Sequence, residues 1–229
     1  MKTSNIIISS FLIFLFGGII LLYIGSIYYK TYDDPSNYLS EEKPLPSFSV
    51  VVAESGAIFN LITEKENKIN QTYLKGTVPN ISSYAVRNDT LFITSKEPKK
   101  GEVKNTKNLT EVFCIGVKSI VGMENSDVRL LGLQADTLNI TTKQSRLEWR
   151  GFEKVTFLSV EGQDSDIYLD GKKLDKIDVK LDKTLLNIDA KENVKSISGK
   201  LKNTSTFDCP SSIKVNLEAD KSSKIYLAN

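Results

Sequence analysis

The chain opens with a long apolar run. From Ile6 to Tyr29 it holds neither a charged residue nor a proline. As a helix this run spans roughly 35 Å, enough to cross a hydrocarbon core of about 30 Å. The competing interpretation is a cleavable signal peptide, whose apolar core usually has only about 7–15 residues and is followed by an Ala-x-Ala-like site, which is absent here. We predict an uncleaved signal anchor over residues 6–29, after a short tail over residues 1–5.

The charges around the anchor predict its orientation. Lys2 precedes it, and the basic residue after it, Lys30, is soon followed by Asp33 and Asp34. The positive-inside rule then favours a cytoplasmic N-terminus and a periplasmic or otherwise extracytoplasmic C-terminal region, making the chain a single-pass protein of the cell membrane. Residues 30–47 combine three prolines with four acidic residues and show no periodicity, so we expect a linker there.

Short strands dominate the rest of the chain, and six of them repeat. Each repeated segment reads small-x-apolar-x-apolar, begins with Ser or Thr, and follows the previous one after 18 to 21 residues. A small or turn-forming residue stands six positions after each first residue, where a tight corner needs one. The segments begin at Ser126, Ser145, Ser165, Thr184, Ser205 and Ser223.

A period near 19 with two strands per unit is typical of a β-solenoid. We therefore predict an all-β, parallel β-helix-like domain over residues 48–229, in preference to an antiparallel sandwich. Inward positions of the second strand are expected at pairs such as Leu138 and Ile140, and Trp149 and Phe157 are also assigned to the core. The fourth unit looks irregular, with Val194 and Ile197 out of phase.

Stacked coils make specific neighbours. Adjacent rungs lie about 4.8 Å apart, so Asp127, Arg146 and Asp166 should form a ladder of alternating charge, and Arg129 should face Glu148. The two cysteines, Cys114 and Cys209, should lie about five rungs or roughly 24 Å apart, well beyond disulfide reach. We predict two free, largely buried thiols.

Composition narrows the chemistry. The chain has no histidine, which removes the commonest general base, Ser-His and Cys-His pairs, and most zinc or copper sites. We assign no catalytic, cofactor-binding or metal-ligating residue, and interpret the repeated serines as corner residues. Acidic residues also cluster along the chain, and we favour solvent-facing turn positions over a calcium or glycosidase site for Asp164, Asp166, Asp170, Asp175 and Asp178.

The net charge of +2 gives no broad field that would attract nucleic acid. We therefore expect no nucleic-acid partner. A local basic cluster is interpreted as a solvated loop and comprises Lys96, Lys99, Lys100, Lys104 and Lys107.

Residues 48–227 resemble the head-GIN group of bacterial envelope proteins, which are common in Bacteroidetes and often labelled "putative auto-transporter adhesins". The resemblance rests on the opening runs at 48–52 and 58–62 and on two repeat units, Ser-Asp-Val-Arg-Leu-Leu-Gly from Ser126 and Ser-Asp-Ile-Tyr-Leu-Asp-Gly from Ser165. It implies a β-solenoid, an adhesin-like role and no catalytic residues. The family's usual Gly-Ser-Gly before each strand is replaced here by Asn-Ser-Asp and Asp-Ser-Asp.

Three functions are compatible with these features. The first is a non-enzymatic envelope module, held at the membrane by residues 6–29, that binds a protein or glycan or braces an assembly. The second is a polysaccharide-active enzyme built on a β-helix. The third is an accessory or sensor subunit, which would need a membrane partner because only about five residues are expected on the cytoplasmic side.

Overall fold

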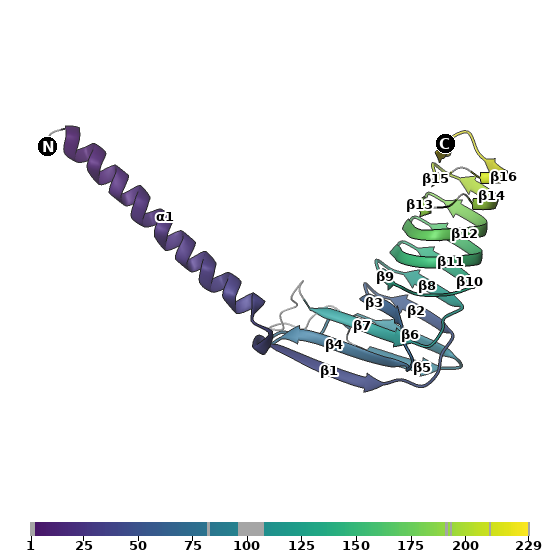
Figure 1. The fold of residues 1–229 in the computed structure, drawn as a ribbon, viewed down its shortest axis with the longest axis horizontal. Coiled ribbons are helices and arrows are strands. Elements are labelled where there is room, and N and C mark those ends of the chain that lie inside the picture. Colours follow the sequence, from purple (N-terminus) through teal and green to yellow (C-terminus); the bar gives the residue numbers. More distant parts are fainter. Residues whose placement is uncertain are drawn as a thin grey trace.

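The computed structural model describes residues 3–81, 83–95, 108–190, 192, 194–210 and 212–228. The predicted basic cluster at residues 96–107 lies outside this part of the chain. Helix α1 (Thr3–Asp33) extends away from a β domain and joins it through the short 3-10 helix η1 (Pro35–Asn37) (Figure 1). A window of 18 residues, Ser10–Ile27, is long and apolar enough to cross a membrane and is not buried by the rest of the protein. By these criteria the helix fits either a signal sequence or an anchor.

The β domain is a solenoid with two ladders of strands that join, within the described residues, into one 17-stranded sheet. Along the first ladder the stacking order is β5 (Ser83–Arg87), β6 (Thr90–Thr94), β2 (Val50–Glu54), β8 (Ser119–Met123), β10 (Thr137–Lys143), the second halves of β11 (Arg146–Gln163) and β12 (Asp166–Asp182), β14 (Val194–Lys202) and β16 (Ser212–Ala219).

The second ladder runs beside the first along the same stack (Figure 1). Its order is β1 (Tyr38–Pro44), β4 (Lys68–Leu74), β7 (Leu109–Cys114), β3 (Ile58–Thr63), β9 (Asp127–Leu131), the first halves of β11 and β12, β13 (Leu185–Ala190), β15 (Thr206–Pro210) and β17 (Lys224–Ala228). The predicted solenoid is confirmed, with coils of about 20 residues against the predicted period near 19. Pairing is parallel along both ladders except at the N-terminal end, where β1, β4 and β5 pair antiparallel.

The front of the solenoid is stacked out of sequence order. Strands β2 and β3 lie between the coil formed by β6 and β7 and the coil formed by β8 and β9. Cys114 on β7 is therefore six strand-to-strand steps from Cys209 on β15, one more than the sequence suggested. Both thiols are free and buried, as predicted.

The segment 30–47 is more ordered than the linker that the sequence predicts. Residues 38–44 form β1, which pairs antiparallel with β4 from Tyr38↔Leu74 to Pro44↔Lys68. The expectation of an irregular chain is therefore wrong for this stretch. Its strand was hidden because β1 is an edge strand without a buried face, and its charged residues carry no alternation.

Apolar side chains fill the interior along the whole stack. The Trp149 ring is fully buried; its indole N–H donates to the carbonyl of Leu133 at 3.1 Å, and the ring lies 4.8 Å from that of Phe152, measured between centroids. The inward assignment of Trp149 is confirmed. That of Phe157 is wrong, because Leu158 and Val160 point inward and the Phe157 side chain is 38 % exposed. Inward residues along β11 are spaced by three at 152, 155 and 158, so the chain leaves strict alternation where the coil bends.

The fourth unit is regular, contrary to the prediction. Ile197 aligns with Ile177 and Leu201 with Leu181, and all four side chains are buried. Val194 and Ile197 looked out of phase because they are three residues apart, and buried residues have the same spacing where β11 and β12 bend. The glycine that follows them, Gly199, aligns with the buried Val179. Its φ of +136° and a distance of only 1.9 Å from an added Cβ to the Val179 carbonyl oxygen leave room for nothing larger than glycine.

Candidate functional site: the groove at the serine corners

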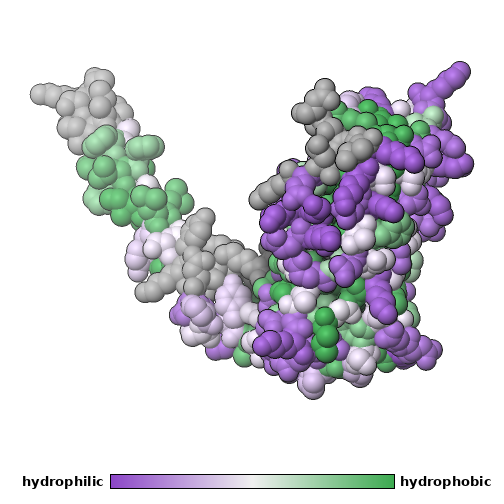
Figure 2. Space-filling view, turned by 45° about the vertical axis from the view of Figure 1, so that its right-hand side comes forward, coloured by the Kyte–Doolittle hydropathy of each residue, from purple (hydrophilic) through white to green (hydrophobic). Residues whose placement is uncertain are grey.

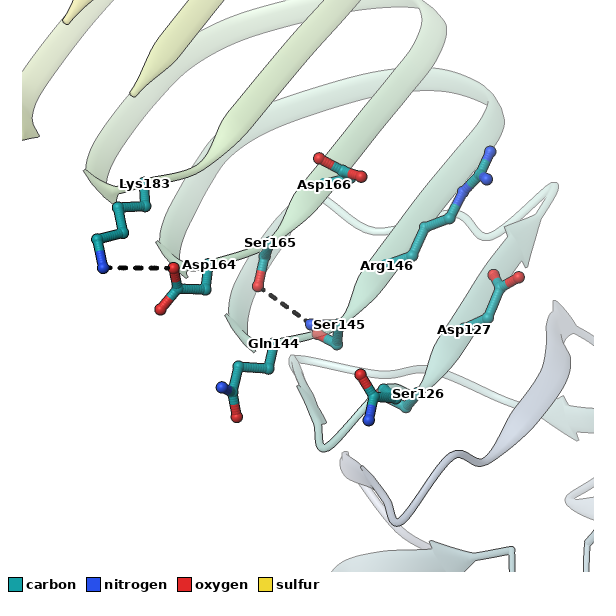
Figure 3. Close-up of a pocket in the computed structure, with 10 residues that line it drawn as sticks. Ser126, Asp127, Gln144, Ser145, Arg146, Asp164, Ser165, Asp166 and Lys183 are labelled. Atoms are coloured by element: carbon teal, nitrogen blue, oxygen red, sulfur yellow. Dashed lines mark hydrogen bonds and ion pairs between the residues drawn. The ribbon is translucent and has the colours of Figure 1, made fainter. Parts of the chain in front are cut away.

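A groove of about 520 Å³ follows one corner of the solenoid across successive coils (Figure 3). Every residue that lines it is polar or charged, and each one either lies in the corner itself or is the first residue of the strand that follows. The lining consists of Asn125, Ser126, Asp127, Gln144, Ser145, Arg146, Asp164, Ser165, Asp166 and Lys183.

Left-handed backbone conformations form this corner. Asn125, Gln144, Asp164 and Lys183, each directly before a repeat serine or threonine, have φ between +46° and +63°. Their amide N–H groups donate along the stack, for example from Gln144 to the Gln163 carbonyl at 2.9 Å. Since Asn and Asp tolerate this conformation better than most residues, the Asn-Ser and Asp-Ser pairs match the corner. Sequence reasoning found the serines but missed the residue before each one, although its fixed position was a usable signal.

The serine and threonine hydroxyls hold the corner together. Ser165 Oγ donates to the Gln163 carbonyl at 2.7 Å and accepts the Ser145 N–H at 3.3 Å. Two coils on, Ser205 Oγ donates to the Lys202 carbonyl at 2.6 Å and accepts the Thr184 N–H at 3.3 Å. These side chains are buried, which supports the prediction that they are corner residues. A hydroxyl already donating to a carbonyl is poorly placed to act as a nucleophile.

Ser126 differs from its counterparts. It is equally buried, but its hydroxyl has no hydrogen-bond partner within the described part of the chain. The same is true of Oδ1 of its neighbour Asp127, whose Oδ2 accepts from Arg129 at 3.2 Å. The N-terminal end of the groove therefore contains two polar atoms whose hydrogen-bonding capacity is unused by these residues.

The charges at the rim follow the predicted ladder. The register pairs Arg146 with Asp127 on one side and with Asp166 on the other, and Figure 3 shows these three side chains on successive strands. Arg129 faces Glu148 in the register, as expected. The ion pairs of these strands, however, run along a strand: Arg129 binds Asp127, and Arg150 binds Glu148. Residues two apart on one strand share a face, which makes this geometry easy to reach.

Other side chains complete the groove. Lys183 Nζ lies 3.8 Å from Asp164 Oδ1, and the Arg146 guanidinium lies 5.3 Å from the centre of the Tyr168 ring. The groove thus combines carboxylates, amides and cations on a rigid frame with a spacing of about 4.8 Å.

The structure separates the acidic cluster seen in the sequence. Asp164 and Asp166 line the groove, whereas Asp175 lies 3.1 Å from the Lys195 ammonium and Asp178 accepts from the Ser198 hydroxyl at 2.8 Å. Within the described residues no group of three potential metal ligands gathers.

The two cysteines offer little nucleophilic chemistry. Burial raises the pKa of the Cys114 thiol to about 12. The pKa of Cys209 is also raised to about 12, by burial and then by the nearby charge of Asp208. Because the thiolate is the reactive form, both groups are inert near neutral pH.

Comparison with solved structures places this geometry on a known fold. The chain is similar to a "putative adhesin" from Bacteroides fragilis NCTC 9343. The TM-score is 0.61 at 15 % identity, and the match covers 83 % of this chain and 96 % of the other. At this identity the similarity shows the fold alone: a β-solenoid shared with an adhesin-like protein.

A second "putative adhesin", from Parabacteroides merdae ATCC 43184, gives a TM-score of 0.43 at 11 % identity, over 84 % of this chain and 97 % of the other. No protein-family model and no curated protein sequence matches the chain.

Proposed function

We propose that this protein is a non-enzymatic, adhesin-like module of the head-GIN type, tethered to a bacterial cell membrane, whose corner groove binds an envelope glycan. Residues 1–5 form a cytoplasmic tail, residues 6–29 the anchor, and residues 48–229 together with strand β1 the extracytoplasmic domain. The fold shared with the Bacteroides "putative adhesin" and the exposed apolar helix support this topology.

The observation that carries the glycan assignment is the composition of the groove. Its lining is wholly polar, and the backbone that presents it is held by buried hydroxyls, so the groups are already ordered before a ligand binds. A protein interface usually needs a desolvated apolar or aromatic centre. A chain of sugar hydroxyls instead needs closely spaced donors and acceptors, which Asp127, Arg146 and Asp166 provide on consecutive rungs.

A polysaccharide-active enzyme is the second candidate because of the same carboxylates. Asp127 and Asp166 are two rungs apart, about 10 Å, close to the separation in inverting glycosidases. Against this, the Asp166 side chain is exposed, whereas a general acid at neutral pH is usually kept protonated by an apolar pocket. The binding assay below therefore includes a search for cleaved products.

The test is binding of the full-length chain, in detergent or nanodiscs, to a panel of purified envelope polysaccharides. Replacing Arg146→Gln and Asp166→Asn together should weaken binding about tenfold or more, since hydrogen bonds to charged groups are the strong ones. Lys154→Gln on the exposed side of β11, outside the groove lining, is the matched control and should bind normally. Unchanged binding by the double variant would refute the groove as the site, and new reducing ends or unsaturated products would favour the enzyme.

The anchor is tested separately. Membranes washed with alkaline carbonate should retain the chain, and its intact mass should include residues 6–29. A mature form beginning after this segment would establish a signal peptide instead. A sensor role would require a partner bound by the helix, so replacing residues 6–29 with an unrelated membrane helix should abolish all crosslinked partners if that role holds, and retain them if the domain binds by itself.

A further inference from the structure

The strands at the two ends of the solenoid differ in the residues that they expose. At the N-terminal end the last strand of the second ladder is β1, whose outer edge carries the exposed side chains of Glu41, Glu42 and Lys43 and ends at Pro44. Charged residues and proline on an edge strand prevent pairing with another chain. The edge of the second ladder is therefore protected against association at this end.

The coil formed by β16 and β17, at the other end, has an apolar edge. Three side chains at inward-facing positions are substantially exposed there: Val215 by 41 %, Ile225 by 36 % and Leu227 by 39 %. The residues that align with them one coil earlier are almost fully buried: Ile197 at 1 %, Phe207 at 0 % and Cys209 at 1 %. Figure 2 shows hydrophobic residues gathered at this upper end of the stack. Stacked repeats normally cover such a coil, because each repeat buries its core against its neighbours.

The sequence of β16 is complementary to itself. Its central residues read Lys214-Val215-Asn216-Leu217-Glu218, with Lys, Asn and Glu facing outward. Paired antiparallel with a second copy about Asn216, each Lys214 lies opposite a Glu218, each Val215 opposite a Leu217, and Asn216 opposite itself. Opposite charges and apolar pairs at facing positions are the arrangement that stabilises antiparallel strands.

Strand β17 has the same property. It reads Ile225-Tyr226-Leu227 at its centre, so antiparallel pairing about Tyr226 places Ile225 opposite Leu227. Asn216 lies four residues before the corner that begins at Asp220, and Tyr226 lies three residues after Ser223, where that corner ends. The two centres are therefore nearly level, and one two-fold axis through the solenoid can pass close to both.

We propose that this edge is a homodimer interface, in which two copies join end to end through β16 and β17 about a two-fold axis. The pairing extends both ladders across the junction and covers the exposed Val215, Ile225 and Leu227 with their counterparts. The chain enters each solenoid at the opposite end, through η1 and β1, so the points at which the two α1 helices join the domains lie at the far ends of the pair (Figure 1). This inference does not depend on the glycan assignment.

Disulfide crosslinking tests the axis directly. In the dimer the two Asn216 Cβ atoms lie about 4.5–5.5 Å apart, within reach of a disulfide after Asn216→Cys. Mild oxidation of the full-length variant, in detergent, should give a covalent dimer. Ser198→Cys is the matched control: Ser198 aligns with Asn216 one coil inside the edge, so this variant keeps the interface but should give no covalent dimer. The native cysteines are buried and should not compete. Absence of a covalent dimer of Asn216→Cys, or equal crosslinking of the control, would overturn the proposal.

Charge complementarity between two different variants provides a second, independent readout. In the Asn216→Cys background, Lys214→Glu places like charges across its own dimer, and so does Glu218→Lys. Mixed together, these two chains have opposite charges at both facing pairs. Heterodimers should then exceed each homodimer about tenfold in crosslinked product, resolved by a mass tag on one chain. A statistical mixture, in which half of the product is heterodimer, would contradict this register. Any effect of a substitution on the folding of its own chain cancels in this comparison, because the same chain enters both the homodimer and the heterodimer.

Discussion

The hydrogen bonds of the corner hydroxyls predict that alanine substitutions at two equivalent positions of the repeat, Ser165 and Ser126, differ in their effect on the free energy of unfolding. Ser165→Ala removes the donor to the Gln163 carbonyl and the acceptor of the Ser145 N–H. The carbonyl keeps a second partner, the Gln144 N–H at 2.9 Å, but the Ser145 N–H loses this acceptor in a buried corner. Net hydrogen bonds contribute about 0.5–1.5 kcal/mol each, and an orphaned buried donor costs about 1–3 kcal/mol. We expect a loss of about 2 kcal/mol.

Ser126→Ala is the matched control. Ser126 begins the first repeat as Ser165 begins the third, and it is also buried, but its hydroxyl has no hydrogen-bond partner in the described residues. Removing an unsatisfied hydroxyl should change the free energy of unfolding by less than about 0.5 kcal/mol or even raise it.

The assay is urea unfolding of the full-length chain in detergent, followed by the fluorescence of Trp149. This is the single tryptophan of the sequence, and it lies on β11 between the corners of Ser145 and Ser165. With an m-value of about 2 kcal/mol per molar urea, Ser165→Ala should lower the midpoint by about 1 M while Ser126→Ala leaves it nearly unchanged. Equal midpoints for the two variants would refute the reasoning that the hydroxyls act through these hydrogen bonds.

Three further outcomes are expected. Gly199→Ala should cost about 3 kcal/mol or more, because its Cβ meets a carbonyl oxygen, whereas Gly116→Ala, with open space around it, should cost less than about 0.5 kcal/mol in the same unfolding assay. Phe157→Ser should cost less than about 1 kcal/mol and Leu158→Ala about 2–5 kcal/mol; the reverse order would show that β11 faces the other way. Both cysteine thiols should resist a thiol reagent at pH 8 until urea is added. Because their pKa is raised on folding, their contribution to stability is complete below about pH 8.5, the ordinary thiol pKa, and is lost as the pH rises towards about 12. Unfolding midpoints between pH 8 and 11 measure that loss, and rapid labelling of the native chain at pH 8 would contradict it.

The repeat predicted much of the fold because its signal is local. A serine, two alternating apolar residues and a small corner residue recur at Ser126, Ser145 and Ser165, and each feature follows from the geometry of one coil. Inward residues must be apolar, corners must accept left-handed backbone, and equal coil lengths bring equivalent positions into register. The Asp127, Arg146 and Asp166 ladder follows from that register alone.

The sequence predictions were wrong where the direction of a side chain or the pairing of a strand depends on geometry beyond that strand. Phe157 faces outward because bends in the coil break the alternation, and Val194 and Ile197 looked out of phase because the same bend spaces buried residues by three. Strand β1 owes its place to pairing with β4 and has no buried face of its own.

By itself the sequence determined an apolar N-terminal helix, because that depends on one continuous apolar run. It also determined a stack of coils of about 20 residues, the corners and the polar character of their rim, because these depend on spacing within one repeat unit. The tertiary structure decided the out-of-order stacking of β2 and β3, the direction of the ion pairs, the shape of the groove, and the contrast between a protected N-terminal edge and an apolar edge at β16 and β17. These features depend on which coils become neighbours and on which edge strands are left without a neighbouring strand. Contacts between residues distant in the chain leave no periodic pattern in the sequence.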